Sequence, residues 1–226
     1  YTKSLKIREE IGDKKGIASS LNNIGLIYWR QGDYAKAIDY YSRSLKIEEE
    51  IGDKQGIAGS LNNIGGIYFE QLDFPKSLDY HTRSLKIKEE LGDKSGIASS
   101  LNNIGLIYSD QGDYAKAMDY YTKSLNIKEE IGDKNGIAMS LINIGNIYKN
   151  QGDLAKAIDY YTKSLKIREE IGDKQGIAAS LGNIGKTYQR QEKNKSALTY
   201  LKDAINISQD INALALTNDF SFTLYK

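Results

Sequence analysis

Apolar residues recur along the chain every three or four positions, and polar residues fill most of the positions between them. In the segment between Asp13 and Gly32 the recurring residues are Ile17, Leu21, Ile24, Gly25 and Tyr28. In the segment between Asp33 and Gly52 they are Tyr34, Ala37, Ile38, Tyr41 and Leu45. A spacing near the helical period of about 3.6 residues predicts that each segment is an amphipathic helix with one buried face.

The residues at the ends of these segments are typical of helix boundaries. Asp13 and Asp33 precede the two segments, where an aspartate accepts hydrogen bonds from backbone N–H groups that lack a helical partner. Gly32 and Gly52 follow them, where a residue in the left-handed conformation often ends a helix. Connections of two or three residues favour antiparallel packing of consecutive helices, so we expect antiparallel helix pairs.

The two segments together form a unit that repeats every 40 residues. Residues 21–28 recur as residues 61–68 and 101–108, and in altered form as residues 141–148 and 181–188. Self-similarity at a period of this size is typical of a solenoid of stacked units. We expect whole units at residues 12–51, 52–91, 92–131, 132–171 and 172–211, a partial unit at residues 1–11, and a partial unit or capping helix at residues 212–226.

A glycine lies in the middle of each first segment, where it costs about 1 kcal/mol relative to alanine. These glycines are Gly25, Gly65, Gly105, Gly145 and Gly185. Because the cost recurs in every unit, we expect the backbone of a neighbouring helix to pass close to each glycine.

The repeated residues resemble the signature of the tetratricopeptide repeat family. The matching residues are Leu21, Ile24, Gly25, Tyr28, Ala37, Tyr41 and Ser44, together with the turn at residues 31–34. The family's usual unit is shorter, about 34 residues, and the longer unit is similar to those of Pins-type adaptors, kinesin light chains and the arrays of bacterial sensor proteins. The resemblance implies an all-α fold, a right-handed superhelix of antiparallel helix pairs, that binds proteins without catalysis.

Composition narrows the function classes. Lys and Arg number 31 against 30 Asp and Glu, and a net charge of +1 provides no global field that would attract nucleic acid or a membrane. The chain has no Cys and a single His, His81, in the aromatic position of Tyr41 and Tyr121, so we expect His81 to have a packing role. The sequence has no recognisable nucleophile–base or metal-ligand pattern. We expect a cytoplasmic protein that is not an enzyme and uses no metal or cofactor.

A row of asparagines follows the first segments, one position away from their apolar face. Its members are Asn23, Asn63, Asn103, Asn143 and Asn183, and Asn22, Asn62 and Asn102 stand beside it. One interpretation is structural, with each side chain bridging to a neighbouring helix. In the other, the carboxamides line a concave groove and pair with the backbone of an extended peptide, since a carboxamide both donates and accepts hydrogen bonds. The family resemblance supports the second interpretation, because first helices line the groove in that family.

The positions after this row vary while the rest of the unit barely changes. The varying residues that we assign to the binding site are Leu26, Asn146 and Lys186 in one position, Trp29, Phe69 and Lys149 in another, and Arg30, Glu70, Asp110 and Arg190 in a third. Relaxed constraint on exposed residues would also produce this variation. If these positions bind a ligand, the aromatic residues predict an apolar anchor in the partner, and the basic residues predict an acidic stretch.

The function that these observations favour is a protein–protein interaction module, an adaptor or scaffold that binds an extended peptide segment in its concave groove. Two alternatives remain open. The chain is a regulatory or sensor region of a larger bacterial signalling protein, a kinase or cyclase, or it is a structural scaffold that self-associates end to end.

Overall fold

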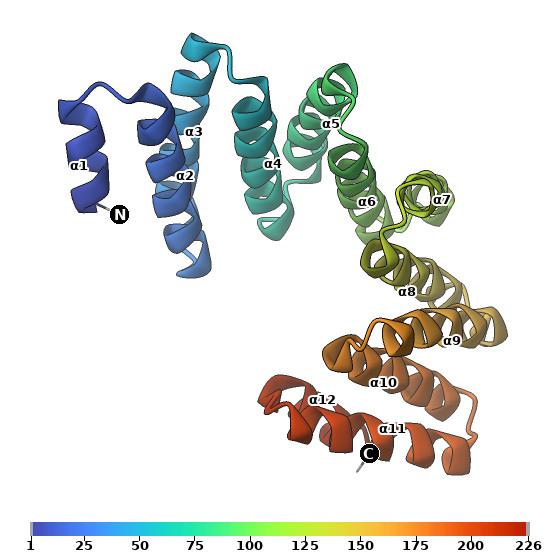
Figure 1. Cartoon of the computed structure of the whole chain (residues 1–226). Coiled ribbons are helices and arrows are strands. Elements are labelled where there is room, and N and C mark those ends of the chain that lie inside the picture. The colour runs from blue at the N-terminus through green and yellow to red at the C-terminus, as the bar shows by residue number, and fades with distance from the viewer. Residues whose placement is uncertain (1, 225–226) are drawn as a thin grey trace. The chain divides into compact units, whose positions relative to one another are not determined.

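The computed structural model describes residues 2–224, which Figure 1 shows as a succession of helices. This part of the chain contains twelve helices and no strand. It divides into two compact parts, each larger than the 40-residue repeat. From here on we call residues 1–111 unit 1 and residues 112–226 unit 2. The predicted all-α class, a solenoid of antiparallel helix pairs, is confirmed.

Within each unit, every helix packs against the helix that follows it in sequence. Unit 1 contains α1 (Thr2–Glu10), α2 (Lys14–Arg30), α3 (Tyr34–Ile51), α4 (Lys54–Glu70), α5 (Phe74–Leu91) and α6 (Lys94–Asp110). Unit 2 contains α7 (Tyr114–Glu130), α8 (Lys134–Asn150), α9 (Leu154–Glu170), α10 (Lys174–Arg190), α11 (Asn194–Asp210) and α12 (Leu214–Leu224). The division of the chain into five whole repeats and two partial ones stays a prediction.

The helices begin and end with the predicted chemistry. The Asp13 carboxylate accepts the backbone N–H of Gly16, and the aspartates that precede α3 to α10 each accept the N–H three residues later. Gly32 follows α2 with a φ of 77°, in the left-handed region that L side chains rarely adopt. After α4 this position is Leu72, with a φ of 60°, so this turn carries strain of about 1 kcal/mol.

In each repeat we call the earlier helix of the pair the first helix and the later one the second helix. The core of unit 1 forms where first and second helices meet. Ala37 and Tyr41 of α3 pack with Ile64 and Ile67 of α4 in one buried cluster. A Cβ added at Gly25 would lie 2.8 Å from Cε1 of Tyr41. At this glycine the close neighbour is an aromatic ring and not a backbone, whereas a Cβ added at Gly185 would lie 3.2 Å from the backbone nitrogen of Leu201, as expected.

Unit 2 has the same packing between its first and second helices and a further contact at α12. A Cβ added at Gly145 would lie 2.6 Å from Cε1 of Tyr161, as at the corresponding position of unit 1. Phe220 of α12 is buried and packs against Gly182 of α10. Helix α12 therefore covers part of α10, which is a first helix.

Candidate functional site

The first helices of unit 1 are α2, α4 and α6. A hydrogen bond between two side chains joins α4 to α6. Nδ2 of Asn103 on α6 donates to Oδ1 of Asn62 on α4 over 3.1 Å. We call the surface that carries the predicted binding residues the first-helix face. It is defined by Asn23, Leu26, Trp29 and Arg30 and by the residues at 40-residue intervals from them.

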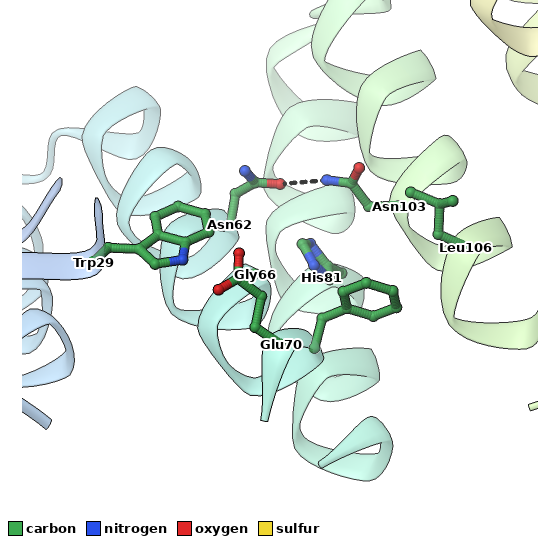
Figure 2. A pocket seen from close by; sticks show the side chains of 8 residues that line it. Trp29, Asn62, Gly66, Glu70, His81, Asn103 and Leu106 are labelled. Atoms are coloured by element: carbon green, nitrogen blue, oxygen red, sulfur yellow. Dashed lines mark hydrogen bonds between the residues drawn. The ribbon is translucent and has the colours of Figure 1, made fainter. Parts of the chain in front are cut away.

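A pocket of about 220 Å³ opens on the first-helix face of unit 1 (Figure 2). Its lining residues are Trp29 of α2, then Asn62, Gly66, Phe69 and Glu70 of α4, His81 of α5, and Asn103 and Leu106 of α6. In Figure 2, Trp29 and Leu106 stand on opposite sides of the pocket, and His81 lies between them. Three first helices and one second helix therefore build this pocket within a single unit.

Two departures from the repeated sequence open the pocket. Gly66 stands where the neighbouring repeats have Leu26 and Leu106. A Cβ at Gly66 would lie 2.9 Å from Cη2 of Trp29, so the indole lies directly against the glycine. His81 occupies a position that is tyrosine in three other repeats, so the phenol hydroxyl is missing as well. The indole of Trp29 thus takes the place where a leucine side chain begins in the neighbouring repeats, and the pocket of about 220 Å³ is bounded by this indole, Gly66 and His81.

The Glu70 carboxylate is directed into this space, between Trp29 and His81 (Figure 2). Its Oε2 accepts a hydrogen bond of 2.8 Å from the Tyr34 hydroxyl. This hydrogen bond raises the pKa of Tyr34. Among residues 2–224, Glu70 forms no ion pair with a lysine or arginine. The pocket therefore combines aromatic walls with one carboxylate that forms no ion pair among residues 2–224, and Arg30 of α2 lines the adjoining pocket together with this glutamate.

His81 forms the floor of the pocket and packs there as expected for an aromatic position. Its side chain is 3% exposed, and its Nδ1 has no hydrogen-bond partner in the described part of the chain. Burial lowers the pKa of His81 to about 4, and the charge of Lys88 on the same helix acts in the same direction. The imidazole is consequently neutral near pH 7.

Three cations gather on the first-helix face of unit 2. A guanidinium N–H of Arg190 donates to the backbone oxygen of Lys149 over 3.2 Å. Burial lowers the pKa of Lys149, and the charges of Arg190 and Lys186 lower it further. Lys186 forms an ion pair of 2.5 Å with Asp219 of α12. This cluster suits an anionic group, and α12 already supplies one.

The position that is open in unit 1 is filled in unit 2. Asn146 stands in the position of Gly66, and Tyr161 in the position of His81. The Tyr161 hydroxyl donates to Oδ1 of Asn146 over 2.6 Å, and Nζ of Lys149 donates to the same oxygen over 3.4 Å. These hydrogen bonds join the residues that stand in the positions of Gly66 and His81, and a separate pocket of about 190 Å³ in unit 2 has Asn143 and Asn183 in its lining.

The predicted asparagines have different surroundings. Nδ2 of Asn22 contacts Oγ of Ser44, Oε1 of Glu48 and Oγ of Ser60 at 2.9 to 3.0 Å. Asn22 therefore stabilises a buried network between α2, α3 and α4, which is the structural interpretation. Asn102 is buried, with 9% exposure.

The remaining predicted residues lie where a ligand can reach them to different degrees. Asn23, Leu26, Arg30, Glu70, Asp110 and Arg190 are exposed, and Asn62, Asn63, Asn103, Asn143, Asn146, Asn183, Trp29, Phe69, Lys149 and Lys186 are half-buried. Unit 1 brings Trp29, Asn62, Phe69, Glu70 and Asn103 together in its pocket, and unit 2 brings Lys149, Lys186 and Arg190 together. Their role in binding stays a prediction.

Sequence reasoning missed four residues that shape these sites. Gly66 and His81 open the pocket, Tyr34 positions the Glu70 carboxylate, and Asp219 engages Lys186. One signal was available, because the glycine and the histidine depart from the repeat within the same 40 residues. Nothing in the sequence marked Asp219.

The described residues offer non-covalent recognition as their chemistry. No group of three His, Asp or Glu side chains among them is arranged to hold a metal ion. None of the described helices has the length and apolar character needed to cross a membrane. The sites are instead built from aromatic rings, carboxamides and single charges.

The sequence profile of the tetratricopeptide repeat family matches residues 1–50, 56–130 and 136–210 of the chain. No curated protein matches the chain in sequence.

Solved structures show the same fold at low sequence identity. BtubC (BKLC) from P. vanneervenii is 18% identical with a TM-score of 0.81, covering 93% of this chain and 89% of that one. The STAND protein PH0952 from Pyrococcus horikoshii has a tetratricopeptide repeat sensor. It is 21% identical with a TM-score of 0.81, and the match covers 98% of this chain and 33% of PH0952. The Rap conjugation gene regulator of plasmid pLS20, in complex with the Phr* peptide, is 16% identical with a TM-score of 0.77, covering 94% and 59%. The chain thus spans about a third of PH0952 and less than two thirds of the Rap regulator.

Proposed function

The chain belongs to the tetratricopeptide repeat family, and on that premise we propose that it binds an extended peptide segment of a partner protein along its first-helix face. Repeats of this family generally mediate protein–protein interactions, and their fold is generally non-catalytic. The observation that carries the proposal is the pocket of unit 1, where aromatic rings, carboxamides and a carboxylate meet on one face.

Different parts of the first-helix face contribute different contacts to such a peptide. The carboxamides of Asn23, Asn63 and Asn183 pair with its backbone whatever its sequence. In a peptide bound to unit 1 the aromatic rings of the pocket pack against an apolar portion, and in a peptide bound to unit 2 the cations attract an acidic stretch. Each hydrogen bond contributes about 0.5–1.5 kcal/mol, so a short segment reaches micromolar affinity, which corresponds to about 8 kcal/mol.

The comparison with solved structures supports this proposal at the level of the fold. The Rap conjugation gene regulator, which resembles the chain over 94% of its length, is seen in complex with the Phr* peptide. A peptide-binding protein can therefore be built on this arrangement of helices.

A selection from a random peptide library tests the proposed function. The native protein is compared with a variant in which Asn63, Asn103 and Asn143 are replaced by alanine. We expect peptides that bind the native protein with micromolar affinity and bind the variant at least tenfold more weakly, since backbone pairing is lost. A matched control replaces the exposed Lys46, Lys86 and Lys166 of the second helices by alanine. Equal binding to all three proteins contradicts a role for the asparagine row.

A second candidate function, a regulatory region of a larger signalling protein, is favoured by the contact between α12 and α10. Asp219 of α12 occupies Lys186, so an acidic peptide that binds the same lysine competes with α12. Hydrogen exchange of the α12 amides is measured with and without a polyglutamate peptide. Faster exchange on binding supports a switch that passes through α12, and unchanged exchange contradicts it.

A further inference from the structure

We propose that the pocket of unit 1 binds the cationic side chain of a peptide residue, with arginine preferred over lysine. The inference rests on the proposed peptide-binding function and adds the chemistry of the residue that enters at this point. It follows from the space, the walls and the charge of the pocket.

The space suits a long side chain with an apolar stem. The pocket has a volume of about 220 Å³, and Gly66 in its lining has no side chain that could project into it. Trp29, Phe69 and Leu106 surround that volume with apolar surface. The methylene groups of an arginine or a lysine pack against such walls while the charged head reaches a polar rim.

The negative charge of Glu70 favours a peptide side chain that ends in a cationic group. Glu70 directs its carboxylate into the pocket, and one of its oxygens is hydrogen-bonded only to the neutral hydroxyl of Tyr34. A guanidinium is planar and carries parallel N–H donors, so it bonds a carboxylate with two hydrogen bonds and stacks on an aromatic ring. The indole of Trp29 beside Glu70 supplies that ring. A lysine makes the ion pair without the stacked, two-bond geometry.

Other side chains fit the pocket less well. A leucine fills the space but displaces water from the Glu70 carboxylate without giving it a partner, and burying an unpaired charge is costly. An aspartate or glutamate is repelled by Glu70. The floor does not oppose a cation at the rim, because His81 is neutral near pH 7 and the deeper Lys88 is hydrogen-bonded to Ser100 over 2.9 Å.

Unit 2 provides an internal contrast to this chemistry. Lys149 and Asn150 stand there in the positions of Phe69 and Glu70, and Lys186 stands in the position of Leu106. The same places on the repeat therefore carry positive charge in unit 2 and a carboxylate with aromatic walls in unit 1. Selectivity for a cation belongs to unit 1 alone.

The single tryptophan of the chain makes the proposal directly measurable. Trp29 is the only Trp and lines the pocket, so its fluorescence reports what enters. The full chain is titrated with N-acetyl-arginine amide, N-acetyl-lysine amide and N-acetyl-leucine amide. We expect saturable changes in fluorescence with arginine binding most tightly, and leucine binding about tenfold more weakly than arginine, because the charge-assisted hydrogen bonds are absent.

Three variants locate the effect. Glu70→Gln removes the carboxylate and is expected to weaken binding of the arginine amide about tenfold while strengthening binding of the leucine amide, which no longer desolvates a charge. Gly66→Leu and His81→Tyr restore the residues that other repeats have in these positions, and each is expected to fill the pocket and abolish the response without loss of helicity. Glu49→Gln, an exposed carboxylate at the end of α3, controls for net charge and is expected to bind like the native protein.

The outcomes separate this inference from the proposed function. Equal binding of the arginine and leucine amides, or an arginine response that survives in Glu70→Gln, overturns the cation pocket. In a parallel experiment, hexapeptide pools with Arg, Leu or Glu fixed at one position are titrated against the native chain. Pools that bind equally and depend on the asparagine row leave the peptide-binding function standing while contradicting the preference for arginine. An arginine amide that binds while every pool fails supports the pocket and contradicts the peptide-binding function.

Discussion

The α4–α5 pair of unit 1 and the α8–α9 pair of unit 2 are built on the same repeat, and their first-helix faces differ where Gly66 and Asn146 occupy the same position. Both pairs have a mid-helix glycine, Gly65 or Gly145, packed against the ring opposite it, but the rings belong to His81 in α5 and Tyr161 in α9. The difference lies in a few positions of the first-helix face and in the aromatic position opposite them. An unchanged frame thus presents two different recognition surfaces.

The two surfaces differ in charge as well as in shape. In unit 1 the pocket has Phe69 and Glu70 at its edge, whereas unit 2 has Lys149 and Asn150. In unit 2 the Tyr161 hydroxyl is bonded to Asn146 of the same repeat, in the position that is Gly66 in unit 1. The comparison indicates that a few substitutions on one repeat change both the shape and the charge of this surface.

The largest expected effect on stability comes from removing the Tyr161 side chain, which stands in unit 2 in the position of His81. Tyr161→Ala is expected to lower the free energy of unfolding by about 3–5 kcal/mol, because a buried ring packed on Gly145 is lost together with its hydrogen bond. His81→Ala in unit 1 is expected to cost less, about 1–2 kcal/mol, since space beside it is already open. Urea unfolding followed by circular dichroism measures both values, and equal losses would contradict a filled unit 2 and an open unit 1.

The pH dependence of the free energy of unfolding also distinguishes the α4–α5 pair from the α8–α9 pair, because only the first contains a histidine. The pKa of His81 is lowered in the folded state from 6.5 to about 4, so the unfolded chain takes up the proton first as the pH falls. The stability that neutral His81 contributes is complete above pH 6.5 and is lost as the pH falls toward 4. We expect the free energy of unfolding to drop by about 2 kcal/mol between pH 7 and pH 5.

The control for this titration is His81→Tyr, which gives unit 1 the residue of unit 2. The variant has no histidine, so its free energy of unfolding is expected to stay nearly constant between pH 7 and pH 5. A native protein and a variant with the same pH dependence would show that His81 is not the titrating group.

The smallest expected effect concerns the turns after the two first helices. Leu72 follows α4 with a φ of 60°, and Gly152 follows α8 with a φ of 85°. Leu72→Gly is expected to raise the free energy of unfolding by about 0.5–1 kcal/mol, because relief of the left-handed strain exceeds the entropy cost of glycine. Gly152→Leu is expected to lower it by a similar amount. A destabilised Leu72→Gly variant would mean that contacts of the leucine outweigh its backbone strain.

The features of the fold that sequence predicts well are local. Asp13 and Gly32 stand at helix ends because capping and left-handed conformations depend on a few adjacent residues. The glycine at position 25 correctly indicated a close approach, but the neighbour proved to be the ring of Tyr41. Which atoms approach a helix depends on how two helices pack, and the sequence period alone does not contain that information.

The candidate site was predictable in its position and less so in its contacts. The varying residues Trp29, Phe69 and Glu70 do meet around one pocket, because residues at 40-residue intervals occupy equivalent places on adjacent first helices. Asn22 was assigned to the ligand, but its carboxamide binds the buried Glu48. Two neighbouring asparagines differ in this way because one helical step turns a side chain by about 100 degrees.

The aspartate-capped turns that join successive repeats have a consequence for how the gene changes. Each repeat begins with an aspartate-capped helix and ends at the same kind of turn, so an unequal crossover between two copies adds or removes 40 residues without breaking a cap. One such event can delete, duplicate or displace the copy that carries Gly66 and His81.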